Sequence, residues 1–147
     1  MHESLLEPFN DLSRLYLKRE LLISKLADGR EITLSESEKR VDALIEDKDL
    51  LKLVKMLDEF FAIRLRSEDS VKIVRSYRNR LNRFIDHTIG LEEYSFLLSL
   101  NKEELKKMLE EDKEKLLKRK DLFPILEGQL LILLRWFGRS VRGEKYE

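Results

Sequence analysis

Apolar residues recur at helical spacing along most of the chain, and this pattern predicts an all-α protein. The first such segment runs from Leu5 to Leu26, where apolar side chains stand three, four or seven residues apart. Asp28 and Gly29 follow it. Because glycine accepts the left-handed conformation found just past a helix, we expect the first helix to end there. No two alternating, β-branched segments flank a hairpin turn, so no strand is predicted.

A second, short helix is predicted to begin near Leu34. Thr33 stands three residues before Glu36, which is the capping-box spacing that pairs two otherwise unbonded backbone N–H groups. The apolar residues assigned to this helix are Val41, Leu44 and Ile45.

From Asp49 to Gly90 the apolar spacing continues without an internal glycine or proline. The polar stretch 67–70 either caps a new helix or forms an exposed turn of one helix of about 40 residues. We expect a break or a kink here, because helices of that length usually belong to coiled coils. Whether 49–89 is one helix or two stays open.

A mostly charged helix is predicted after the short apolar segment 91–100. Asn101 followed by Glu104 marks its start, and it is expected to continue to about Lys120. Its apolar stripe is narrow, so we expect it to lie on the outside of the fold.

The final helix, Ile125 to Phe137, is apolar nearly all round, as is typical of a helix that is buried centrally or covered by a partner. We therefore predict a single-domain, antiparallel bundle of six or seven helices over residues 1–138. Residues 139–147 are expected to form a basic, flexible tail.

Composition excludes several kinds of site. The 147 residues include no Cys and two His, which excludes disulfides, thiolate metal sites and cysteine nucleophiles, and makes a His-rich metal site untenable. We expect no metal and no cofactor. The 29 basic and 29 acidic residues, with a single glutamine, resemble the composition of proteins from organisms that grow at high temperature. Without a secretory signal or a membrane span, a cytoplasmic location is expected.

The motifs of common enzymes are missing from the chain. It has no glycine-rich phosphate loop, no Gly-x-Ser-x-Gly elbow and no His-Glu-x-x-His pair. Its paired carboxylates are of the kind that is common on solvated helices. We therefore expect a non-enzymatic protein.

A basic segment between Val71 and Ile85 is the clearest local signal of a binding surface. It contains no acidic residue, and at helical spacing most of its basic side chains share one face opposite the apolar ones. This face either follows the phosphates of a nucleic acid or pairs with acidic residues of the region 31–70. The candidate residues for nucleic acid or an acidic partner are Lys72, Arg75, Arg78, Arg80, Arg83, Arg139 and Arg142.

The apolar C-terminal helix is the second candidate surface. It is either part of the core or an interface with a protein partner or a second copy, because aromatic residues beside arginine are favoured at interface centres. The candidate interface residues are Leu130, Leu133, Leu134, Trp136 and Phe137.

Two segments, 57–66 and 73–81, resemble the mid-domain helix of GINS subunits, with its Arg-x-Leu-Arg or Arg-Leu ending. The resemblance covers about 60 residues and implies a helical subunit of a DNA-replication complex. GINS subunits usually also carry a small β domain, and no such domain is predicted from this sequence. Small helical subunits of CRISPR effector complexes are similar in size and charge.

Arg80 and His87 resemble the Arg-(x)4-6-His motif of the HEPN ribonucleases, which are small helical bundles that act as dimers. The family generally has a polar residue after the arginine, whereas Leu81 follows Arg80 here. Our leading hypothesis is an assembly subunit of a nucleic-acid-processing complex, and a HEPN-type ribonuclease is the enzymatic alternative.

Overall fold

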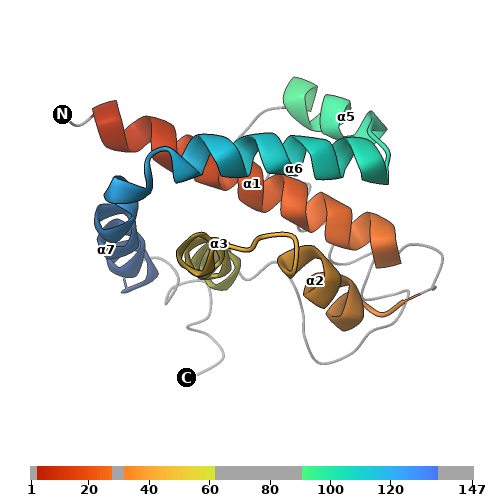
Figure 1. Ribbon diagram of the computed structural model, residues 1–147, viewed down its shortest axis with the longest axis horizontal. Coiled ribbons are helices and arrows are strands. Elements are labelled where there is room, and N and C mark those ends of the chain that lie inside the picture. Colours follow the sequence, from red (N-terminus) through yellow and green to blue (C-terminus); the bar gives the residue numbers. More distant parts are fainter. Residues whose placement is uncertain (1–2, 28–31, 62–90, 136–147) are drawn as a thin grey trace.

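The computed structural model describes residues 3–27, 32–61 and 91–135, and this part of the chain is all-α, as predicted (Figure 1). It contains six α-helices, one short 3-10 helix and no strand. None of these helices has both the length and the hydropathy of a membrane span. The elements are α1 (Glu3–Ala27), α2 (Leu34–Asp42), α3 (Lys48–Phe61), α5 (Leu91–Ser99), α6 (Lys102–Leu117), η2 (Lys120–Leu122) and α7 (Phe123–Leu133).

The first helix, α1, is the central element of the fold. α2, α3, α5 and α6 all pack against it, and every residue from Leu15 to Ser24 is buried. The sequence predicts a first helix with one apolar face, and a C-terminal helix that is either buried centrally or covered by a partner. In the structure α1 has the central position, whereas α7 packs mainly on α3 and leaves one of its faces outside.

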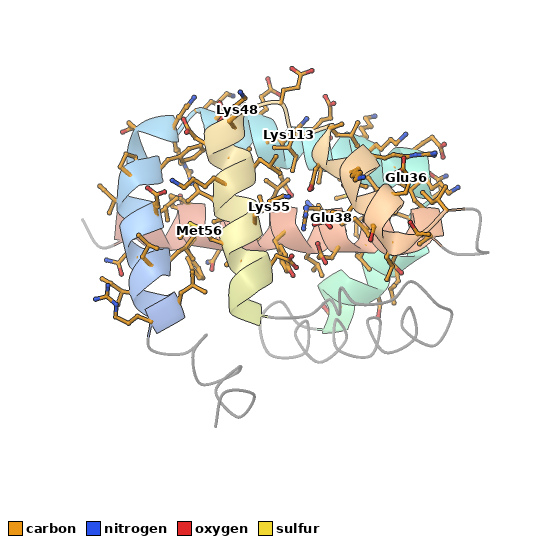
Figure 2. The ribbon with its side chains drawn as sticks, turned by 90° about the horizontal axis from the view of Figure 1, so that it is seen from below. Glu36, Glu38, Lys48, Lys55, Met56 and Lys113 are labelled. Carbon is orange, nitrogen blue, oxygen red and sulfur yellow. The ribbon has the colours of Figure 1, made fainter. Side chains whose placement is uncertain are left out.

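The helices form two pairs that cross. α1 and α6 are antiparallel, since Glu7 near the start of α1 pairs with Arg119 just after α6, and Lys18 pairs with Asp112. α3 and α7 lie side by side across them and run in the same direction (Figure 2). Lys120 and Asp47, which precede α7 and α3, are 2.8 Å apart. The antiparallel arrangement therefore applies to the first pair and not to the second.

Both helix starts that the sequence predicts from capping residues are confirmed. The Thr33 side chain accepts a hydrogen bond from the Glu36 N–H at 3.1 Å and begins α2. Asn101 and Glu104 form a complete capping box at the start of α6. These short-range signals work because the groups that satisfy each other are only three residues apart.

The end of α2 differs from the prediction, because Leu44 and Ile45 are not part of the helix. After Asp42 the chain closes in a tight turn, in which the N–H groups of Leu44 and Ile45 bond to carbonyls three residues back. The Leu44 carbonyl then accepts a hydrogen bond from Lys113 of α6. A contact between distant elements thus fixes the position of this turn, and Ile45 still enters the core.

Candidate interaction surface

The inner face of α7 packs into the core. Phe123, Leu126 and Leu130 are buried at helical spacing, and Leu134 packs partly against them. Leu130 keeps only 1% of its surface exposed, so its side chain has little area left for another subunit. The inner face therefore fixes the helix on the body of the protein.

The outer face of α7 carries three large aliphatic side chains that are about half exposed. The exposed fractions are 49% for Ile125, 54% for Leu131 and 50% for Ile132. Both views place α7 at one end of the molecule, on the left (Figures 1 and 2). Single exposed aliphatic residues are ordinary, whereas three within about two turns of one helix form a patch that water solvates poorly.

Gly128 lies in the middle of this outer face. It stands three residues after Ile125 and four before Ile132, which places all three on one side of the helix. A Cβ atom added at Gly128 would meet nothing within 4 Å. The described part of the fold thus leaves this position open. Ile125, Gly128, Leu131 and Ile132 are called the α7 surface below.

Ion pairs fix the start of α7 against the start of α3. Lys52 pairs with Glu127, and Lys120 contacts Asp47 at 2.8 Å and Asp49 at 3.5 Å. The hydrogen bond from Lys120 is the main reason why the pKa of Asp47 lies below its usual value, and it also raises the pKa of Lys120. Both lysines line a pocket here, but their charges are already compensated by acidic residues. These ion pairs thus hold α7 against α3, and the pocket is not suited to binding an anion.

A guanidinium that solvent does not reach joins α1 to α2. Arg19 is 0% exposed and contacts Asp42 at 2.7 Å, Glu38 at 3.0 Å and Glu20 at 2.5 Å. Lys55 of α3 adds a second cation 3.3 Å from Asp42. Figure 2 shows Glu38 and Lys55 between α2 and α3. These acids bond to cations of the chain itself, so the arrangement is suited to holding helices together.

A second set of ion pairs runs between α1 and α6. Lys18 contacts Asp112 at 2.5 Å, and Asp11 faces both Lys115 and Arg119. Burial raises the pKa of Asp112, and the bond from Lys18 only partly opposes this effect. Within the described residues, no group of three or more histidine or acidic side chains has the arrangement of a metal site.

Most of the site residues predicted from sequence lie outside the described residues. Leu130 and Leu134 have the positions given above, and the side chain of Leu133 is not described. The predicted residues that lie outside the described ranges are Lys72, Arg75, Arg78, Arg80, Arg83, His87, Trp136, Phe137, Arg139 and Arg142. Their roles stay predictions, as do the basic tail and the number of helices in 62–90.

The residues of the α7 surface were not among the predicted interface residues. A helix that is apolar nearly all round has no periodicity to show which side faces the core. The signal that was available is Gly128, an unfavourable residue inside a helix that has no packing role in the described fold. Comparisons of the chain with protein families, with curated proteins and with solved structures found no match.

Proposed function

We propose that this protein is a non-enzymatic assembly subunit, and that the α7 surface binds another protein chain. The observation that carries the proposal is the row Ile125, Leu131 and Ile132, each about half exposed on one helix. Covering such side chains removes apolar area from water, which stabilises a complex by about 25 cal/mol for each Å².

The way α7 is held also supports this role. Its inner face is buried in the core, and the ion pairs of Lys52 with Glu127 and of Lys120 with Asp47 hold its N-terminal end. A helix fixed in this way loses little further freedom when a partner binds, so less of the interaction energy is spent on ordering. The α7 surface therefore has the rigidity of a preformed interface as well as its apolar character.

The proposal is tested by placing a photoreactive amino acid at Ile132 of the full chain and irradiating the cells that produce it. We expect one protein adduct of defined mass that is lost when Ile125→Asp is added. The matched control places the same photoreactive group at Lys106, which is exposed on α6. Adducts at Ile132 that are no more abundant than those at Lys106 would reject the α7 surface as an interface.

The basic segment 71–85 supports a second partner, a nucleic acid. Five cations without an acid lie in fifteen residues of a chain whose total charge is zero. In this proposal the subunit belongs to a nucleic-acid-processing complex, in which the α7 surface binds protein and the basic segment binds phosphates. The resemblance to GINS subunits suggests one such setting.

A further inference from the structure

The charges at the two ends of the α7 surface have opposite sign and equal spacing from its centre. Asp121 stands seven residues before Gly128, and Arg135 stands seven residues after it. Asp121 lies in η2, directly before α7, and Arg135 lies just after its last residue, so the two charges stand at opposite ends of the α7 surface, each about two turns from the glycine. Both charged side chains are exposed, and neither has an ion pair with another described residue.

We propose that the partner of the α7 surface is a second copy of this chain, packed with its α7 antiparallel to the first. This inference rests on the proposed function and specifies the partner. A twofold axis that passes between the Gly128 residues of the two copies places Asp121 of each copy opposite Arg135 of the other. The same contact therefore forms twice. The aliphatic side chains of both copies then cover each other between these pairs. A parallel arrangement would instead bring like charges together.

Gly128 has a packing role in this dimer, whereas it has none in the described part of the single chain. Glycine inside a helix costs about 1 kcal/mol of stability relative to alanine, and the described fold has room for a larger side chain there. At the centre of an antiparallel helix pair, the missing side chain allows the two backbones to approach closely. The residue therefore favours the dimer at the expense of the free chain.

The extent of the contact sets the expected strength of association. Two helices of three turns bury less than the roughly 1,600 Å² of a standard interface. We therefore expect a dimer that dissociates on dilution, and sedimentation equilibrium of the purified full chain from 1 to 500 µM is the suitable measurement. On dilution, the wild type should pass from dimer to monomer.

Two substitutions test the apolar centre. Ile132→Asp should leave a monomer at every concentration. The matched control is Phe96→Asp on α5, a residue that is 55% exposed and distant from α7 in the fold, and it should dimerise like the wild type. Gly128→Leu should weaken association at least about tenfold, while it raises the urea midpoint of the dilute monomer. Circular dichroism confirms that each variant is folded.

Charge reversal tests the antiparallel geometry. Asp121→Lys alone, or Arg135→Glu alone, places like charges opposite each other twice and should weaken the dimer about tenfold or more at low salt. The double variant Asp121→Lys/Arg135→Glu restores both pairs and should recover the wild-type dissociation constant. Recovery is specific, because in a parallel dimer the double variant would repeat the like-charge contacts of the wild type.

Several outcomes would overturn the inference. One is a wild type that is monomeric at 500 µM, and another is a dimer that Phe96→Asp disrupts as strongly as Ile132→Asp. A dimer that the double charge reversal does not restore would rule out the antiparallel contact. If the photoreactive group at Ile132 then couples to a different protein, the proposed function stands and only self-association fails. If it couples to no protein, both fail.

Discussion

Arg19 shows how a charged residue can occupy the most buried of the described helices. Its guanidinium offers five N–H donors in a fixed plane, and the carboxylates of Glu20, Glu38 and Asp42 accept from three of its nitrogen atoms. In the described residues, no buried side-chain nitrogen or oxygen is left without a hydrogen-bond partner. Because the charges are paired, burial of α1 does not leave an isolated ion in the core.

The first prediction removes this cation. Arg19→Met removes the buried cation that Glu20, Glu38 and Asp42 share, so we expect a loss of about 3–5 kcal/mol in the free energy of unfolding. Urea denaturation at pH 7, followed by circular dichroism, measures the change. The expected loss is a large part of the free energy of unfolding of a typical domain, which is about 5–15 kcal/mol.

Arg40→Met is the matched control for this experiment. Arg40 pairs with Glu36 on the surface of α2 at 3.7 Å, and its side chain is 58% exposed. Exposed pairs of this kind contribute little, so the change should stay within about 0.5 kcal/mol. Similar losses for the two variants would show that the buried pairs around Arg19 do not stabilise the fold more than a surface pair does.

At the scale of helices, the sequence predicts what depends on near neighbours. The starts of α2 and α6 follow from Thr33 and Asn101, because a capping side chain and its backbone partner are three residues apart. The centrality of α1 does not follow from periodicity. Arg19 and Glu20 look like the polar side of a surface helix until the acids of α2, which lie further along the chain, are brought to them by the fold.

The orientation of α7 depends on the fold in the same way. Leu130 and Leu131 are adjacent and equally apolar, yet one is buried and the other is half exposed. Packing on α3 makes this distinction, and the apolar pattern of α7 does not indicate it. The all-α class was thus predictable, whereas the exposed face of α7 required the positions of two helices that are far apart in sequence.

A prediction at this scale concerns the start of α3. The Asp47 carboxylate accepts a hydrogen bond from the Leu50 N–H at 2.9 Å and one from Lys120 at 2.8 Å. Asp47→Ala removes both bonds and should lower the free energy of unfolding by about 1 kcal/mol at pH 7. Asp47→Asn keeps an oxygen for the Leu50 N–H and should lose less. Urea midpoints of the three proteins give the comparison.

The pH dependence of this effect has a definite sign. The pKa of Asp47 in the folded protein is lowered, first by the Lys120 bond and then by the Leu50 N–H. Its contribution is therefore fully present above the usual value of 3.8 and is lost as pH falls through the folded pKa. The difference between wild type and Asp47→Asn should shrink from pH 5 to pH 2. A difference that stays constant over this range would contradict the assigned role of the carboxylate.

For the whole molecule, the distribution of charge matters more than its sum. The net charge is zero, so no long-range field of one sign draws a polyanion to the protein. In the described part, several of the lysines and arginines pair with acids between helices. Binding to nucleic acid would therefore have to come from a local concentration of cations, and the segment 71–85 is the strongest one in the sequence.

The last prediction tests whether that segment acts as a phosphate-binding surface. Arg75, Arg78, Arg80 and Arg83 are replaced together by alanine, and affinity for a fluorescent single-stranded RNA is measured at 50 and 200 mM salt. Contacts from up to five cations give a slope of at most about −3.5 in log K against log salt for a single strand, or about a hundredfold loss over this range. The variant should bind weakly at both salt concentrations. Its matched control removes the same number of charges from α6 and its C-cap by changing the exposed Lys102, Lys106, Lys107 and Lys118 to alanine. Because both variants have the same net charge, equal losses would trace binding to total charge and contradict a local site, whereas loss in the arginine variant alone would place the phosphates along 71–85.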